Sequence, residues 1–311
     1  MICAYCGKEG KGTKEHIISN SVLRLFPECY LTMDEERKII YKNDPMVKDV
    51  CAECNNYKIS YIDTYASNFI KKYFVQDYEK DDVLKIEYDH TLIQKMCLKY
   101  AFNDLRSRKK DIAFFDEEIK EYLMDENNSK SLKNVTILAG LAVNVSHISN
   151  YIFGNCKLIW GDSPLFLENS VIMYIDVETG KIIFSKHPQQ LQLKDCALTY
   201  VFRFNSLQLL MICWNKNISN NDLESQKQLL EIQYPYVILN DSGVSNLSRC
   251  TSDITYRVTK LIDVTWGQGI IDGIIESSGI LSSELQKVIK ELDEQLKTEN
   301  ENYIKIHKQN K

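Results

Sequence analysis

The chain has 311 residues, of which 44% are hydrophobic, 26% are charged and 10% are aromatic, and its formal net charge at pH 7 is −5. This composition is typical of a folded globular protein and excludes disorder over most of the chain. The negative net charge argues against a protein that coats nucleic acid non-specifically, because phosphate neutralisation supplies most of that binding. The longest aliphatic runs, "TILAGLAV" and "LQLLMICW", are shorter than the roughly 20 residues that cross a bilayer, so we expect no membrane helix.

The N-terminal segment lacks a basic stretch followed by a long apolar run, so we expect a cytoplasmic protein in a reducing compartment. In such a compartment, metal binding explains paired cysteines better than disulfides do. The ten cysteines include two Cys-x-x-Cys pairs, and the six single ones are expected to be small core residues. Two such pairs can supply the four thiolates of a closed zinc site. We therefore expect a structural Zn²⁺ bound by Cys3, Cys6, Cys51 and Cys54.

The first part of the chain contains few long apolar runs, so a bound metal would support its folding. Within it, "SNSVLRLF" predicts a short helix and "RKIIY" predicts a strand. Apolar residues at spacings of three or four then predict a helix over 52–75, and further helices over 91–109 and 113–125. The polar stretch "DENNSKSLKN" predicts a boundary near residue 130.

Beyond this boundary the pattern changes to short strands. "SVIMYIDVETGKIIFSKH" predicts one hairpin, and "CALTYVFRFNSLQLLMICW" predicts a second hairpin that turns at Asn205 and Ser206. "NNDLESQKQLLEIQ" predicts a helix and "YPYVIL" a strand. The last thirty residues predict a long polar helix that begins with a capping box at Ser283. Its narrow apolar stripe fits either docking on the same chain, which we favour, or pairing with a second copy.

The predicted fold class is therefore α+β. An N-terminal module is stapled by zinc, a helical extension follows it, and the third segment combines antiparallel hairpins, helices and the long C-terminal helix. The three segments are expected over residues 1–75, 76–130 and 131–311.

The segment "KEHIIS" lies between the two cysteine pairs, and in it Glu15 directly precedes His16. The second pair runs into "CNNY", so Asn55 directly follows a predicted zinc ligand. An isolated histidine is most often an exposed loop residue, but the acidic neighbour and the flanking pairs favour a catalytic role here. Imidazole titrates near neutral pH and can accept a proton from water. Carboxylate and amide oxygens are hard ligands that suit Mg²⁺ or Mn²⁺.

This order of motifs resembles that of the HNH, or His-Me finger, endonucleases, in the branch with a four-cysteine zinc, over residues 1–65. The resemblance implies a ββα-metal fold in which a hairpin carries the acid-histidine pair and the following helix carries the asparagine. It implies that His16 is the general base that activates water, and that Glu15 and Asn55 bind one catalytic Mg²⁺ or Mn²⁺. It further implies hydrolysis of phosphodiester bonds, with DNA as the expected substrate.

Some positions depart from the family pattern. Glu15 stands where aspartate is commoner, and Ser19 stands where many members have proline. The insert between the histidine and the second cysteine pair is long, so the middle asparagine of the motif is not assigned, although Asn43 is available. A second acid-histidine pair, Asp89 with His90, precedes a predicted helix and fits a helix cap better than a catalytic site.

Four cations are candidate contacts to nucleic acid: Lys14, Lys58, Arg106 and Arg108. Three of them have a structural alternative. Lys58 fits a contact with backbone phosphate or a solvated helix face, and the nearby Asp63 fits a brace of the site or the same solvated face. The two arginines equally fit stabilisation of a helix C-terminus.

Two functions remain open from the sequence. The first is a metal-dependent endonuclease, in a prokaryotic defence or restriction effector whose segment 131–311 recognises a target, a trigger or an activating partner protein. The second is a zinc-ribbon module that binds nucleic acid or protein and cuts nothing.

Overall fold

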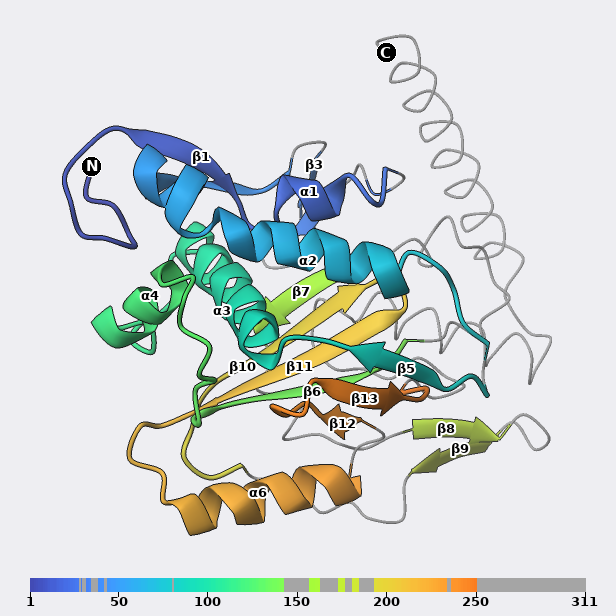
Figure 1. Ribbon diagram of the computed structural model, residues 1–311. Helices are drawn as coiled ribbons and strands as arrows, with labels where there is room; N and C mark the ends of the chain where they lie inside the picture. The colour runs from blue at the N-terminus through green and yellow to red at the C-terminus, as the bar shows by residue number, and fades with distance from the viewer. Residues whose placement is uncertain are drawn as a thin grey trace, which may run out of the picture.

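The computed structural model describes residues 1–27, 29, 32–34, 39–41, 44–79, 81–142, 157–162, 173–176, 181–184, 193–233 and 236–250. They form a mixed α/β structure in which the paired strands are antiparallel (Figure 1). The predicted combination of helices with antiparallel strands is confirmed at this level. The long C-terminal helix predicted from the sequence lies outside the described residues.

The N-terminal segment begins with a hairpin whose two strands are separated by a long insert. Strand β1 (Gly12–His16) pairs with β4 (Met46–Cys51), and the insert contains helix α1 (Asn20–Leu23) and the strand pair β2 (Thr32–Asp34) and β3 (Ile39–Tyr41). A π-helical turn, η1 (Cys54–Lys58), and helix α2 (Ser60–Tyr73) follow β4. The order of elements in this segment is therefore β1, α1, β2, β3, β4, η1 and α2, and the ββα-metal fold that the resemblance implies stays a prediction.

The centre of the molecule is a five-stranded sheet with the order β12-β6-β11-β10-β7. Its strands are β6 (Val135–Leu141), β7 (Leu158–Asp162), β10 (Cys196–Phe204), β11 (Leu207–Trp214) and β12 (Val237–Ile238). Two smaller antiparallel pairs are β5 (Leu84–Glu87) with β13 (Val244–Leu247), and β8 (Met173–Asp176) with β9 (Lys181–Phe184).

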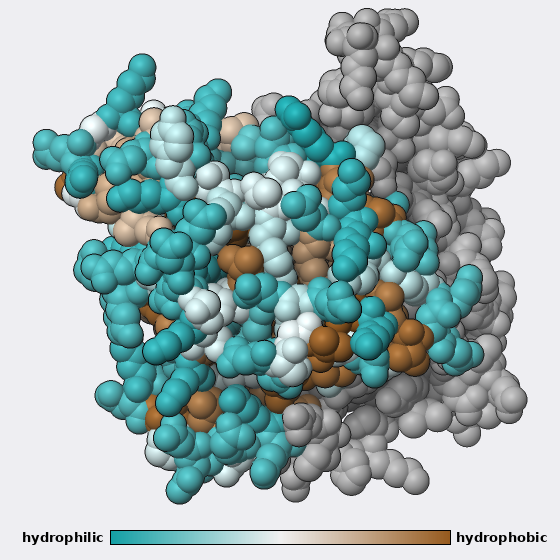
Figure 2. Space-filling view, in the orientation of Figure 1, coloured by the Kyte–Doolittle hydropathy of each residue, from teal (hydrophilic) through white to brown (hydrophobic). Residues whose placement is uncertain are grey.

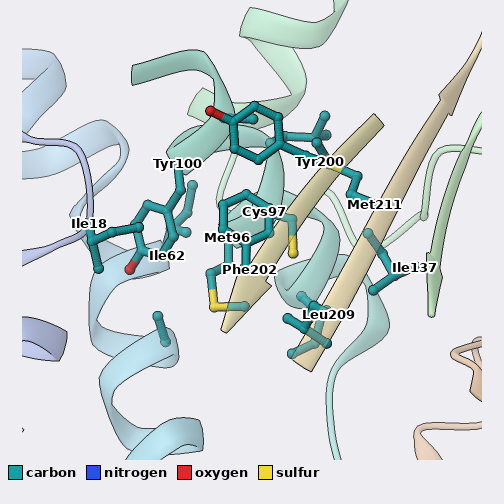
Figure 3. Close-up of a cluster of buried hydrophobic side chains, with 14 of the residues drawn as sticks. Ile18, Ile62, Met96, Cys97, Tyr100, Ile137, Tyr200, Phe202, Leu209 and Met211 are labelled. Atoms are coloured by element: carbon teal, nitrogen blue, oxygen red, sulfur yellow. The ribbon is translucent and has the colours of Figure 1, made fainter. Parts of the chain in front are cut away.

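Both faces of the central sheet are covered by helices. On one face, alternate residues such as Tyr200 and Phe202 belong to the same buried cluster as Ile62 of α2 and Met96 of helix α3 (His90–Ser107) (Figure 3). On the other face, Val201 belongs to a second buried cluster that includes Leu223 and Leu230 of helix α6 (Asn220–Gln233). Figure 1 shows α2 and α3 on one side of the sheet and α6 on the other. Successive strand residues point to opposite faces, so β10 and β11 are apolar along almost their whole length.

Helix α3 (His90–Ser107) is the most enclosed helix of the described part, since fourteen of its eighteen residues are buried. It packs against α2, β4, β7 and helix α4 (Glu117–Met124). Asp89 is its N-cap, and the carboxylate accepts a hydrogen bond from the Leu92 amide at 3.0 Å, which confirms the predicted cap. Polar residues on this helix need partners inside the protein, because few of them reach water.

The helices predicted over 52–75, 91–109 and 113–125 and the two predicted hairpins are present, with ends that differ by a few residues. Strands β5, β6, β7 and β13 were not predicted. One buried cluster contains Tyr5, Ile62, Tyr100 and Phe202, so the apolar core runs through all three predicted segments. Figure 2 shows mostly hydrophilic side chains over the described surface in that view. In the described part, no helix is both long and apolar enough to cross a membrane.

Candidate metal centre and acid-histidine site

The four predicted zinc ligands come together in space. One ligand atom from each of Cys3, Cys6, Cys51 and Cys54 lies within 4.8 Å of the other three, and the Sγ atoms of Cys6 and Cys51 are 3.8 Å apart. Gly7 follows the first pair with a positive φ of 69° and donates its amide hydrogen to the Cys3 carbonyl at 2.9 Å. This tight turn returns the chain past the first two sulfurs, and the left-handed conformation favours glycine. The predicted four-cysteine cluster is confirmed, and it is compatible with structural zinc.

The electrostatics of the cluster suit a divalent cation. Burial opposes ionisation of Cys3, but hydrogen bonds from the backbone of Cys51, Cys6 and Tyr5 outweigh it and lower the pKa of this thiol to about 6. At Cys54, burial and then the Cys6 and Cys51 thiols raise the pKa far above its ordinary value. One thiolate thus forms readily and makes the next one harder to form. A bound Zn²⁺ would neutralise the accumulated charge, and four thiolates are a ligand set typical of structural zinc.

The cysteine cluster links the β1–β4 hairpin to the start of the helical segment. In the hairpin, Gly12 is opposite Cys51 and His16 is opposite Met46. A Cβ atom at Gly12 would lie 2.0 Å from the Lys48 carbonyl oxygen, so only glycine fits this approach of the two strands. On the helical side, the next residue after Cys54 is Asn55, whose place therefore depends on the cluster.

The side chain of Asn55 lies against β1 beside the acid-histidine pair. Its Nδ2 donates to Thr13 Oγ1 at 2.9 Å and to the Lys14 carbonyl at 3.2 Å. Lys14 directly precedes Glu15, so the helical segment and the acid-histidine strand meet at the predicted site. Both hydrogen bonds are made by the nitrogen, and among the described residues the amide oxygen has no partner. That oxygen is the atom with which Asn55 could bind a cation.

His16 ends strand β1, and its side chain is 24% exposed. Its Nδ1 is buried and makes no hydrogen bond to a described residue, and the nearest carboxylate oxygen is Oδ2 of Asp44, 3.9 Å away. This distance is too long for a direct hydrogen bond but fits a bridging water. The Ile17 amide donates to the Pro45 carbonyl at 3.1 Å, which holds the Asp44 segment beside the histidine.

Asp44 is a residue that the sequence analysis missed. Its signal was an acidic residue two positions before Met46, the first residue of β4, which is opposite His16 in the hairpin. Asn43, which was considered for the unassigned position of the motif, lies outside the described residues.

Glu15 is buried and is held by two side chains of α3. Its Oε1 is 2.8 Å from Lys99 Nζ and accepts a hydrogen bond from Asn103 Nδ2 at 3.4 Å. Lys99 also pairs with Oδ2 of Asp63, on α2, at 2.6 Å. Burial opposes the charge of Lys99, but the two carboxylates outweigh it and raise the pKa of its ammonium group. This cation therefore stays protonated although it is fully enclosed.

The four candidate nucleic-acid contacts lie in different environments. Lys14 is exposed, and Lys58 pairs with Glu53 at 3.3 Å on the surface. Arg106 is almost fully buried, with Nη1 2.6 Å from Asp49 and its guanidinium over the Phe102 ring. Arg108 pairs with Asp104 and with Asp162. Both arginines therefore have partners within the chain, as the alternative interpretation of a helix C-terminus allowed, and a contact with nucleic acid stays a prediction.

The second acid-histidine pair has a structural setting. Asp89 caps α3, and the Nδ1 atom of His90 is 2.7 Å from Oδ1 of Asp241 in the loop that leads to β13. This contact fixes the start of α3 to the edge of the sheet region, in agreement with the structural role predicted for the pair.

Comparison with known proteins gives no family to which the chain can be assigned: no protein-family model, no curated protein and no solved structure matches it. The chemistry of the site is therefore argued from its own residues.

Proposed function

We propose that the N-terminal module is a metal-dependent endonuclease of the His-Me finger type, with His16 as the general base. The observation that carries the proposal is the place of Asn55. The four-cysteine cluster joins the helical segment to the hairpin, and the Asn55 amide is thereby hydrogen-bonded to the residues that directly precede Glu15 and His16. Glu15 and His16 on β1 and Asn55 on η1 are residue types that suit phosphodiester hydrolysis, and the cysteine cluster joins these two elements.

Each residue has a distinct role in this proposal. His16 presents Nε2 to water and removes its proton, because Nδ1 is buried on the side of Asp44. Glu15 and Asn55 would hold one Mg²⁺ through the oxygens that their protein contacts leave open, and such ligands fit the hard cation. When bound, Mg²⁺ supplies charge stabilisation for the phosphate oxygens and the leaving oxygen. DNA is the proposed substrate.

The test is cleavage of supercoiled plasmid by the full-length, zinc-loaded protein in Mg²⁺ or Mn²⁺, compared with EDTA. We expect metal-dependent nicking that falls by at least ~100-fold in His16→Ala, since general-base catalysis typically contributes 10²–10⁴-fold. Zinc content and circular dichroism of the variant should equal those of the wild type. His90→Ala is the matched control, because it removes a histidine that also lies beside a carboxylate but that is predicted to be structural. Equal loss in both variants would contradict the role of His16.

A zinc-stapled binding module is the second candidate, and the environment of Glu15 favours it. The carboxylate already has a cation, Lys99, at 2.8 Å, and a carboxylate that only stabilises the fold needs nothing more. This candidate predicts that the wild type binds single-stranded DNA, duplex DNA, RNA or a protein and leaves every nucleic acid intact with either metal. Binding that persists in His16→Ala, together with inert wild type, would favour it over the nuclease.

The wider context of the proposal is a prokaryotic defence or restriction effector. Its support is the combination of a small zinc-stapled module with a larger sheet domain, which could recognise a target, a trigger or an activating protein. Pairing of two copies through the predicted C-terminal helix stays a prediction, because residues 251–311 lie outside the described part.

A further inference from the structure

Helix α3 lies outside the segment that resembles the endonucleases, yet it supplies the contacts of the acid-histidine pair. Lys99 and Asn103, one turn apart, both bind Oε1 of Glu15, and Asn103 also donates to the His16 carbonyl at 3.1 Å. Asn103 is fixed in turn, since its Oδ1 accepts hydrogen bonds from Tyr5 at 2.9 Å and from Arg106 at 2.5 Å. The acid-histidine pair is therefore oriented by a rigid, buried helix.

The charge around Lys99 is not balanced. Its ammonium group, which is 0% exposed, lies between the carboxylates of Glu15 and Asp63, so the three side chains carry a net charge of −1. One carboxylate is enough to neutralise one ammonium group, and a second buried carboxylate costs free energy unless something else compensates it. Asp63 shows this cost: its Oδ1 is buried without a described partner, and burial raises the pKa of the carboxyl group although Lys99 opposes the shift.

The excess negative charge suits a divalent cation. Ligating carboxylates are commonly held by a second hydrogen-bonding group, which orients the free oxygen toward the metal. Glu15 matches this arrangement, because both of its protein contacts use Oε1 and leave Oε2.

We propose that Lys99 is a positioning residue that holds Glu15 by Oε1 so that Oε2 binds a divalent cation, and that Asp63 supplies the excess negative charge that attracts this cation. The inference rests on the proposed function and adds to it the helical extension, which becomes part of the site. Substitutions of Lys99 and of Asp63 then have different consequences. Lys99 orients the Glu15 carboxylate, whereas Asp63 sets the net charge of the site.

The test is direct binding of Mn²⁺ to the full-length, zinc-loaded protein, followed by the electron paramagnetic resonance signal of free Mn²⁺. We expect Asp63→Asn to weaken Mn²⁺ binding roughly tenfold, because it removes a unit negative charge that is separated from Glu15 only by the Lys99 ammonium group. The amide keeps the shape of the side chain and an oxygen for Lys99, so thermal stability should change little. Asp162→Asn is the matched control: its side chain is 24% exposed, against 22% for Asp63, and it also pairs with buried or half-buried cations. It should bind Mn²⁺ as the wild type does.

Lys99→Met separates orientation from charge. If charge alone mattered, loss of the ammonium group would tighten Mn²⁺ binding; if Lys99 positions Glu15, binding weakens in spite of the added negative charge. Tighter binding in Lys99→Met, or unchanged binding in Asp63→Asn, overturns the inference. If Lys99→Met does not fold, Asp63→Asn still decides it.

Glu15→Gln distinguishes this inference from the proposed function. Loss of Mn²⁺ binding in Glu15→Gln together with unchanged binding in Asp63→Asn would keep the metal site and overturn the role of the Lys99–Asp63 pair. A wild-type protein that binds no Mn²⁺ contradicts both.

Discussion

The N-terminal module and the central sheet are held together by different interactions. The module shares the apolar core through residues such as Tyr5 and Ile62, and it has in addition a two-stranded hairpin, four converging thiols and the enclosed charges around Lys99. The sheet depends on apolar burial, since every residue of β6 and of β11 is buried and helices cover both faces. A two-stranded hairpin is marginal by itself in water, whereas a five-stranded sheet between helices buries enough apolar area to be stable. The proposed site therefore lies in the region where thiols and enclosed charges add to apolar burial.

Removal of zinc should have the largest effect, and it should affect the N-terminal module more than the central sheet. Chelation is expected to abolish amide protection in β1 and β4 and to leave protection in β10 and β11, because structural zinc contributes roughly 10–16 kcal/mol in small zinc domains. Acidification acts in the same direction, since protons compete with zinc for the thiolates and burial already raises the pKa of Cys6. Hydrogen exchange with parallel measurement of zinc content checks the prediction. Equal loss of protection in both regions would show that they unfold as one unit.

Lys99→Met should give the next largest effect. The variant leaves the buried Glu15 carboxylate and the half-buried Asp63 carboxylate without their shared cation, and loss of one partner from a buried ion pair costs about 3–5 kcal/mol. Urea unfolding measures the change. Lys216→Met is the control, because Lys216 also contacts two carboxylates, those of Asp116 and Glu118, but its side chain is 45% exposed. The control should cost less than about 1 kcal/mol.

Ile137→Ala tests the apolar core of the central sheet. Ile137 is fully buried in β6, against α3 and the neighbouring strands (Figure 3), and its truncation should cost about 2–5 kcal/mol, near 3 if the site partly collapses. Zinc content should not change, because none of the ligands lies on this strand. A variant that loses zinc together with stability would mean that the sheet is needed to form the cysteine cluster.

Asp89→Ala should give the smallest effect. It removes the carboxylate that caps α3 and should cost about 1 kcal/mol, whereas Asp89→Asn should cost almost nothing because asparagine caps as well as aspartate. Thermal unfolding of the two variants measures the difference. Since α3 holds Glu15, Mn²⁺ binding in Asp89→Ala also tests whether loosening the start of this helix reaches the site.

The sequence predicted features whose causes are local. The spacing within each cysteine pair, the 3.6-residue periodicity of α2 and α3, the cap at Asp89 and the turn between β10 and β11 depend on neighbouring residues. The turn is an example: Asn205, one of the two residues predicted there, has a positive φ of 50°, which asparagine tolerates better than most residues. Strand β6 was missed because a short apolar run is compatible with a strand or with a buried helix.

The residues around the acid-histidine pair could be predicted only in part. Glu15, His16 and Asn55 were found because they lie beside cysteine pairs in a recognisable order. Lys99 and Asn103 were not found, because on an amphipathic helix they look like residues of a solvated face. Only the burial of α3 on nearly all sides turned them into internal partners. The same burial gave Arg106 and Arg108 partners within the chain, although both stand in a basic run that suggests phosphate contact.

The sequence by itself therefore determined which four cysteines converge, where the helices α2, α3 and α4 form, and which histidine follows an acidic residue between two cysteine pairs. The tertiary structure decided which charges lie inside: it placed Lys99 between Glu15 and Asp63 and brought Asp44 to His16. Local patterns depend on backbone propensity and short-range spacing, which the sequence states directly. The charge of a buried site depends on which distant side chains are packed together without water, and only the folded core sets that.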